Sequence, residues 1–244
     1  MTSLPQPVHI ASITTENATV RTLVFDKRMV ADPGQFVMAW LPGVDEKPFS
    51  LVCADPVTLT IARVGPLTAG VHALKPRERL WLRGPLGRPF RLDPTLQAHP
   101  TSILLVAGGY GAAPLYFLAQ RAMAARREVT VISGAQTSRD VLFARRFAAL
   151  GARVVVTTED GSLGIQGLAT DAVAGLLNET EYQCVYACGP EPMLDAVERL
   201  ARAHSLPAQL SYEQYMRCGF GVCGSCARGD WLVCRDGPVR RIST

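Results

Sequence analysis

Cysteines near one end of the chain are the feature that most restricts what it can fold into. The 244-residue sequence contains seven cysteines, and four of them are Cys218, Cys223, Cys226 and Cys234. The opening Met-Thr-Ser-Leu-Pro has no cationic stretch followed by an apolar core, so we expect a cytoplasmic protein without a secretion signal. Because the cytoplasm keeps thiols reduced, a disulfide framework is disfavoured and the clustering indicates a metal site.

The spacing of the four cysteines favours one kind of metal site. Four residues lie between Cys218 and Cys223, and two lie between Cys223 and Cys226. This is the C-x4-C-x2-C arrangement of plant-type ferredoxins, and it predicts a [2Fe–2S] cluster. Gly219, Gly221 and Gly224 allow the positive φ angles that a tight loop around such a cluster needs. A structural zinc site and unrelated reduced thiols are the alternatives. Zinc sites usually carry two C-x2-C pairs, and this segment has one.

The first hundred residues are expected to form β structure. Short apolar or alternating runs are separated by turn formers such as Asp32-Pro33-Gly34, a pattern typical of an antiparallel barrel or sandwich. A short helix is expected near Ala69–Leu74. The runs are His9–Ile13, Thr19–Phe25, Phe36–Leu41, Thr58–Val64 and Arg79–Leu82.

From about residue 100 the pattern changes to strands that alternate with helices, which predicts βαβ units and a parallel sheet. The expected strands are Ser102–Ala107, Glu128–Ser133, Arg153–Thr157 and Gln183–Ala187, and the expected helices are Ala113–Ala125, Val141–Leu150, Leu168–Leu177 and Pro192–Ala203. After Leu210 the periodicity is lost. We therefore predict an α+β multi-domain chain: an antiparallel β-barrel over 1–99, an α/β nucleotide-binding domain over 100–207 and a small iron–sulfur segment over 208–244.

Charge and composition argue against nucleic-acid binding and against a membrane protein. The formal net charge is only +4, and the lysines and arginines form no stripe interleaved with aromatic residues, so nucleic-acid binding is not expected. No apolar run reaches the roughly 18–20 residues that span a bilayer, so a membrane protein is not expected either.

Two turns of the α/β region suit a dinucleotide. An apolar strand runs into Gly108-Gly109-Tyr110-Gly111-Ala112-Ala113-Pro114, where a glycine turn and a helix start can hold a pyrophosphate. Alone, this G-x-G-x-x-P sequence is equally compatible with an ordinary tight turn. A second turn, Cys188-Gly189-Pro190, follows the last predicted strand, at the sheet edge where ligands of open α/β sheets bind.

The order of these motifs resembles the ferredoxin reductase superfamily, and the short cysteine segment closely resembles the electron-transfer subunits of class 1B dihydroorotate dehydrogenase. The resemblance covers essentially the whole chain. It implies an FAD-binding barrel, and Gly84-Pro85-Leu86-Gly87 matches a motif of the family. Lys47 stands where the family has arginine, so phosphate binding there would be a point-charge contact.

The resemblance also implies which residues bind the cofactors, and it assigns no residue as a catalytic acid or base. Cys218, Cys223, Cys226 and Cys234 would hold the [2Fe–2S] cluster. FAD would contact Lys47, Pro48, Phe49, Ser50, Ile61, Ala62, Arg63, Leu67 and Thr68, and NAD would contact Gly109, Gly111, Pro114, Cys188, Gly189 and Pro190.

The resemblance implies an FMN-containing catalytic subunit as the partner, in a heterotetramer. This subunit would oxidise dihydroorotate and pass electrons through the cluster to FAD, and FAD would reduce NAD⁺. We expect this partner on a patch around Phe220, Val222 and Trp231. The Pro66-Leu67 turn and the short spacer before Cys234 depart from the family. They keep open an NAD(P)H-oxidising reductase subunit for a different oxidoreductase, and a zinc-bound interaction module is the alternative from another class.

The choice between NAD and NADP rests on the segment after the second strand of the α/β region. Arg139 could meet a 2′-phosphate, whereas Asp140 could meet a ribose hydroxyl. The resemblance implies NAD, and NADP is the alternative.

Overall fold

The computed structural model describes residues 4–92 and 102–242, and the chain divides into two compact units. The first unit joins Met1–Pro89 to Glu213–Pro238, and the second joins Phe90–Tyr212 to Val239–Thr244. The segment 208–244 is therefore split between them. Its first residues form a strand of the second unit's sheet, and its cysteines fold with the first unit. The expected boundary near residue 99 falls among residues outside the described ranges.

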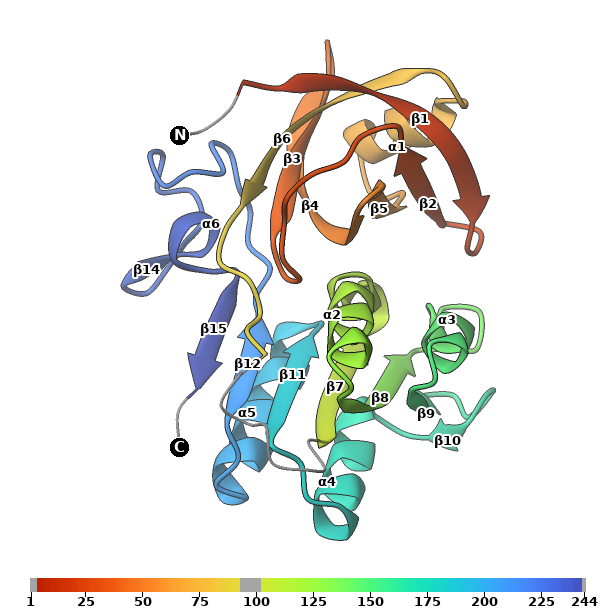
Figure 1. The fold of residues 1–244 in the computed structure, drawn as a ribbon, viewed down its shortest axis with the longest axis vertical. Coiled ribbons are helices and arrows are strands. Elements are labelled where there is room, and N and C mark those ends of the chain that lie inside the picture. Colours follow the sequence, from red (N-terminus) through yellow and green to blue (C-terminus); the bar gives the residue numbers. More distant parts are fainter. Residues whose placement is uncertain (1–3, 93–101, 243–244) are drawn as a thin grey trace. The chain divides into compact units, whose positions relative to one another are not determined.

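The first unit is a closed six-stranded barrel with antiparallel pairing, which resolves the expected choice between barrel and sandwich (Figure 1). Its strand order is β1-β2-β5-β4-β3-β6, and a helix, α1 (Pro66–Ala73), connects the last two strands in sequence. The strands are β1 (Gln6–Thr15), β2 (Val20–Phe25), β3 (Phe36–Leu41), β4 (Asp45–Ala54), β5 (Val57–Ala62) and β6 (Arg79–Leu86).

Strand β4 is the element of the barrel that the sequence did not indicate. Its first half, Asp-Glu-Lys-Pro-Phe-Ser, contains residues that are depleted in strands, and proline removes a ladder donor. Pairing with β3 holds it in place, with Val37 opposite Phe49 and Phe36 opposite Ser50. The proposed flavin motif therefore lies on a strand.

Strand β3 is an apolar run that is buried on both of its faces. Phe36, Val37, Met38 and Ala39 are all buried, although successive residues of a strand point to opposite faces. Phe36 and Met38 pack against residues of the cysteine segment, including Met216 and Val233. The cysteine segment therefore covers one face of a barrel strand.

The second unit is a seven-stranded sheet in the order β10-β9-β8-β7-β11-β12-β15, parallel except for the antiparallel β15 (Figure 1). Helices α4 and α5 pack against each other, while α2 lies across the other face of the sheet. The strands are β7 (Ser102–Gly108), β8 (Glu128–Ala135), β9 (Arg153–Thr158), β10 (Ile165–Gln166), β11 (Cys184–Cys188), β12 (Ala208–Ser211) and β15 (Val239–Ile242), and the helices are α2 (Ala112–Ala124), α3 (Ala144–Ala149), α4 (Ala169–Glu179) and α5 (Glu191–Ala203).

One sequence expectation for this unit was wrong in extent. The helix expected over Val141–Leu150 is confined to α3, because Phe143 has a left-handed φ of 62° and stands at the helix start. The sequence after Leu210 has no helical or strand periodicity, and the elements found there are short: β13 (Ala227–Arg228), β14 (Trp231–Leu232) and α6 (Val233–Asp236) in the first unit, and β15 in the second. These elements are too short for a periodic pattern to register.

The strand order of this sheet predicts the edge at which a ligand would bind. From β7 the chain proceeds outward through β8 and β9, and it then returns to place β11 on the other side of β7. Open α/β sheets bind ligands where the order reverses, beyond the carboxyl ends of the strands. That position lies beyond Gly108 and Cys188, where both glycine turns begin.

Within the described ranges, the helices are all too short or too polar to traverse a lipid bilayer.

Candidate functional site

The four clustered cysteines lie in the barrel unit as two pairs. In the first pair, the sulfur of Cys218 accepts hydrogen bonds from the backbone N–H groups of Val222 (3.4 Å) and Cys223 (3.5 Å). In the second, the sulfurs of Cys226 and Cys234 are 3.2 Å apart, and the Cys234 N–H donates to Cys226 Sγ at 3.4 Å. Among the described residues, no three His, Cys, Asp or Glu side chains converge as they would on a single metal ion.

The two pairs differ in their exposure to water. Cys226 and Cys234 are each only 2% exposed, whereas Cys223 lies on the surface. Burial, reinforced by the adjacent Cys226, raises the pKa of Cys234 to about 12. Hydrogen bonding to Ser225 lowers the pKa of Cys223 to about 6. Four thiols with backbone N–H groups directed at their sulfurs suit thiolate ligation of an iron–sulfur cluster.

The glycines of this segment adopt the backbone conformation that the sequence predicted. Gly219, Gly221 and Gly224 have φ angles of 73°, 87° and 71°. A Cβ on Gly219 would lie 2.9 Å from Met38 Cγ, so this position requires a residue without a side chain as well as a left-handed backbone conformation. A Cβ on Gly224 would meet no atom within 4 Å.

Gly219→Ala is therefore expected to weaken cluster retention more than Gly224→Ala. Both changes impose a left-handed φ on an L-residue, which costs about 1–2 kcal/mol. Only the first adds a clash with Met38, at a further cost of about 1–3 kcal/mol. Iron content after chelator challenge and the midpoint of thermal unfolding measure the difference, and equal losses in the two variants would contradict the packing argument.

The cysteine segment is joined to the barrel by packing and by two cations. Met216, Cys226 and Cys234 share one buried cluster with Phe36 and Met38, and Leu86 and Trp231 pack against it. The amino group of Lys47 lies 5.2 Å from the centre of the Tyr215 ring, and the guanidinium of Arg83 donates to the carbonyl oxygen of Cys218 at 2.9 Å. The sequence did not point to Arg83, Met216 or Tyr215.

The expected flavin residues lie on neighbouring elements of the same barrel. Lys47, Pro48, Phe49 and Ser50 are half-buried on β4, which pairs with β5 and packs against α1. The amino group of Lys47 forms an ion pair with Asp45.

The strand β5 and helix α1 contribute the remaining flavin candidates. Ile61 is buried within β5, Ala62 is half-buried, and Arg63 is exposed just beyond the strand. Leu67 is buried, and the Thr68 hydroxyl is occupied, accepting from the N–H groups of Val64 and Gly65 at 2.9 Å. The first turn of α1 can therefore offer backbone N–H groups, rather than these two side chains, to a phosphate.

The two glycine turns of the α/β unit come together at the predicted ligand edge. Gly109 has a φ of 52°, and a Cβ on Gly111 would overlap the carbonyl oxygen of Cys188. A Cβ on Gly189 would lie 2.9 Å from Gly108 Cα, so the two backbones are in direct contact. Pro114 is buried in the first turn of α2, and Pro190 is the residue before α5. Two helix N-termini, with their partial positive charge, thus flank one edge.

The segment that bears on nucleotide choice follows β8. Asp140 accepts a hydrogen bond from the Thr137 hydroxyl at 2.8 Å, and Arg139 is exposed beside it. Either side chain can reach solvent at this edge.

Comparisons with known proteins cover the segments that carry both parts of the candidate site. A family model described as the oxidoreductase NAD-binding domain matches residues 105–199, and one described as the iron–sulfur cluster binding domain of dihydroorotate dehydrogenase B matches residues 213–243. One similar solved structure is of an NADH-dependent reduced ferredoxin-NADP oxidoreductase. That chain is 27% identical with a TM-score of 0.85, over 96% of this chain and 87% of that one.

Curated relatives of the chain point to one family of electron transfer subunits. A probable dihydroorotate dehydrogenase B (NAD(+)) electron transfer subunit from Thermococcus kodakarensis is 44% identical over 90% of this chain and 89% of its own. The one from Methanocaldococcus jannaschii is 39% identical over 96% and 89%.

The fold and site together define an NAD-linked electron-transfer oxidoreductase of the ferredoxin reductase class, and the matches support FAD, a [2Fe–2S] cluster and NAD as its cofactors. Within that class, the chain belongs to the family of dihydroorotate dehydrogenase B electron transfer subunits. The family relationship implies a catalytic partner subunit.

Proposed function

We propose that this chain connects the oxidation of dihydroorotate, on an FMN-containing catalytic subunit, to the reduction of NAD⁺. The observation that carries the proposal is the shared core of Cys226 and Cys234 with Phe36 and Met38, which builds the cluster ligands into the barrel that bears the flavin motif. When bound, FAD supplies exchange between one-electron and two-electron chemistry, and the cluster supplies one-electron transfer.

The residues of the chain have binding and positioning roles in this proposal. Cys218, Cys223, Cys226 and Cys234 would ligate the cluster through their thiolates. The core around Met216 excludes water from the side of the second cysteine pair. In this proposal no side chain of the chain is required to donate or remove a proton.

The flavin site in this proposal uses charges and an aromatic ring from adjacent elements. Lys47 and Arg63 supply cations for the pyrophosphate, and the first turn of α1 follows Arg63 closely in sequence. Phe49 and Ser50 supply a ring and a hydroxyl for the isoalloxazine.

The nucleotide site would be formed by the two touching turns. Gly109 and Gly111 on one turn, and Gly189 on the other, allow the backbone to approach a pyrophosphate and a ring closely. Pro114, Cys188 and Pro190 complete the proposed contacts. We assign NAD rather than NADP because Asp140 is held at the β8 end by Thr137, in the region where a carboxylate accepts from a ribose hydroxyl.

The proposed partner surface surrounds the exposed cysteine pair. Phe220 is 41% exposed and Val222 is 76% exposed, whereas Trp231 is only half-buried and packs against the core. We propose that the catalytic subunit docks on the first two residues, in a heterotetramer. A cytoplasmic location fits a segment whose thiols must stay reduced until they are metallated.

The proposal is tested by two measurements on the purified chain. We expect flavin and iron–sulfur absorption bands with about two irons per chain, and dihydroorotate-dependent NAD⁺ reduction after mixing with the cognate catalytic subunit. A colourless protein without iron would refute both redox assignments. A protein with both cofactors but no activity in the mixture would refute the substrate assignment alone.

A second candidate is an NAD(P)H-oxidising reductase subunit for a different oxidoreductase. The likeness to the NADH-dependent ferredoxin-NADP oxidoreductase chain, with a TM-score of 0.85, favours retaining it. Co-purification of the tagged chain with a partner other than a dihydroorotate-oxidising subunit would support this candidate.

A further inference from the structure

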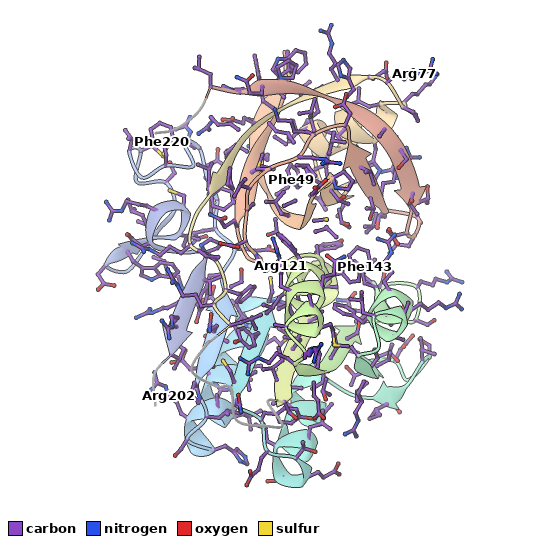
Figure 2. All side chains as sticks on the ribbon, viewed as in Figure 1. Phe49, Arg77, Arg121, Phe143, Arg202 and Phe220 are labelled. Carbon is purple, nitrogen blue, oxygen red and sulfur yellow. The ribbon has the colours of Figure 1, made fainter. Side chains whose placement is uncertain are left out.

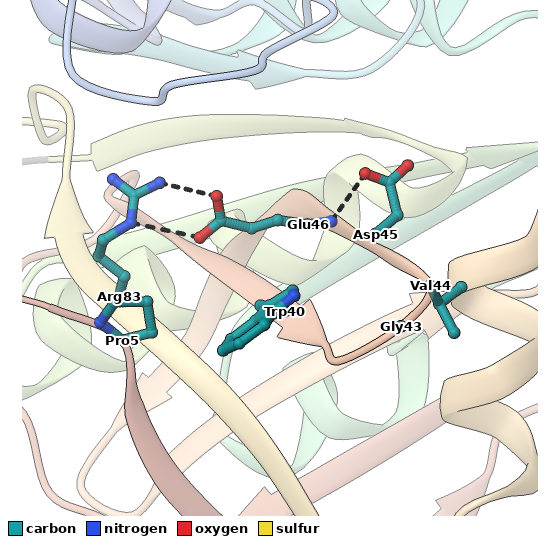
Figure 3. Close-up of a pocket in the computed structure, with 7 residues that line it drawn as sticks. All are labelled: Pro5, Trp40, Gly43, Val44, Asp45, Glu46 and Arg83. Atoms are coloured by element: carbon teal, nitrogen blue, oxygen red, sulfur yellow. Dashed lines mark hydrogen bonds and ion pairs between the residues drawn. The ribbon is translucent and has the colours of Figure 1, made fainter.

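Arg83 is a buried cation that the proposed cofactor contacts do not use. It lies on β6 and is 8% exposed. Its Nε and one terminal nitrogen donate to the two carboxylate oxygens of Glu46 at 3.2 and 2.9 Å, as Figure 3 shows. Such a bidentate pair fixes the orientation of the guanidinium as well as its position.

The remaining sides of this guanidinium are occupied by the cysteine loop. The nitrogen that meets Glu46 at 2.9 Å also donates to the carbonyl oxygen of Cys218 at 2.9 Å. The carbon at the centre of the guanidinium lies 5.4 Å from the centre of the Phe220 ring, a cation–π distance. The other terminal nitrogen is buried and makes no hydrogen bond within the described part of the chain. Arg83 therefore links the barrel to the backbone of a proposed cluster ligand.

Glu46 extends this link to the flavin motif, because it directly precedes Lys47 on β4. The two strands β4 and β6 flank β3 in the barrel, so the ion pair spans that strand. A cavity of about 540 Å³ beside the pair is lined by Trp40 and Val44 among others (Figure 3). Water in this cavity can reach Glu46, whose side chain is 24% exposed.

We infer that Arg83 is a positioning residue that fixes the Cys218 loop against the flavin-bearing strand, and that the Arg83–Glu46 pair tunes the reduction potential of the cluster. The inference rests on the proposed cluster ligands. Reduction adds a negative charge to the cluster, which a nearby buried cation stabilises and a nearby carboxylate opposes.

The two partners of the pair should consequently shift the potential in opposite directions. R83M leaves Glu46 without its counter-charge, so we expect the cluster potential to fall. E46Q keeps the shape and leaves the positive charge uncompensated, so we expect the potential to rise. At a fixed ambient potential, the ratio of reduced to oxidised cluster should change about threefold to tenfold in each variant, as expected for a charge change near a partly screened site.

The test is a redox titration of the holoprotein followed by electron paramagnetic resonance, with iron content measured on each sample. R79M is the matched control, because Arg79 lies on the same strand but is exposed and stacks on Trp81. We expect its potential to equal that of the wild type, and R83M/E46Q to fall between the two single variants.

Opposite shifts support the inference, and so does a rise in E46Q alone if R83M fails to retain iron. Unchanged potentials in iron-loaded variants would overturn it, as would shifts of both single variants in the same direction, because mere loosening of the loop has no dependence on the sign of the charge. A wild-type protein without iron would instead overturn the cluster assignment, and iron analysis separates that failure from the failure of this inference.

Discussion

Replacing Cys234 by serine is expected to abolish the cluster while leaving the α/β unit folded. The thiol lies 3.2 Å from Cys226 Sγ in a buried cluster of side chains, so it has no exposed position from which solvent or another thiol could replace it. A hydroxyl oxygen is a poor substitute for a thiolate in an iron–sulfur site, and it remains buried among apolar groups. We expect iron affinity to fall on the order of 100-fold or more, beyond the losses caused by outer-shell changes.

The measurements are iron and sulfide per chain, and the visible spectrum. Cys53→Ser is the matched control, because Cys53 is half-buried on β4 and its thiol donates to the Asp55 carbonyl oxygen, away from the four ligands. It should retain full iron content. Full iron content in Cys234→Ser would exclude Cys234 as a ligand, and equal losses in both variants would indicate general instability instead.

Local chemistry explains why the cysteine loop was predictable. In this chain the cysteines, and the glycines that let the backbone turn around a small cluster, lie close together in sequence, so their spacing alone indicates them. The positive φ angles of Gly219, Gly221 and Gly224 follow from the same requirement and are confirmed. The apolar strands were predictable for a related reason, because burial on both faces leaves a continuous apolar run in the sequence.

Contacts between distant segments explain what was not predictable. Arg83 alternates with buried Leu80 and Leu82 on β6, so the pattern places it on the outer face with Arg79. It is buried because Glu46 and residues more than a hundred positions later in the chain contact it on that face. Likewise Met216 has no pattern of its own and gains its role from Phe36 and Met38. Such packing is a property of the tertiary fold and leaves no local signal.

In the proposed nucleotide site, the individual turns were predictable from sequence, whereas their contact with each other was not. Each glycine turn could be recognised in sequence, but an ordinary tight turn explained the first one equally well. The reversal of strand order between β7 and β11 places both turns at one edge, and the contact of Gly111 with the carbonyl of Cys188 joins them. Convergence of two independent motifs is a stronger argument for a dinucleotide site than either motif alone.

Gly111→Ala is expected to give the largest effect on nucleotide binding. An added Cβ would overlap the carbonyl oxygen of Cys188 and lie 2.9 Å from the Gly189 nitrogen. These are backbone atoms, so relief requires the two turns to separate. A displacement of about 1 Å at such a site can cost on the order of 100-fold in function. We expect the dissociation constant for NADH, measured by calorimetric titration, to rise about 10- to 100-fold, since overpacking costs about 1–3 kcal/mol.

Gly175→Ala provides the matched control for that change. Gly175 lies inside helix α4 of the same unit, and a Cβ there would meet no atom within 4 Å. Alanine at a helix-interior position stabilises by about 0.5–1 kcal/mol relative to glycine, so thermal unfolding should move slightly upward and NADH affinity should not change. If Gly111→Ala bound NADH as tightly as Gly175→Ala does, the two turns would not form the nucleotide site. A loss of affinity with retained secondary structure would instead place the nucleotide where the backbones of Gly111 and Cys188 meet.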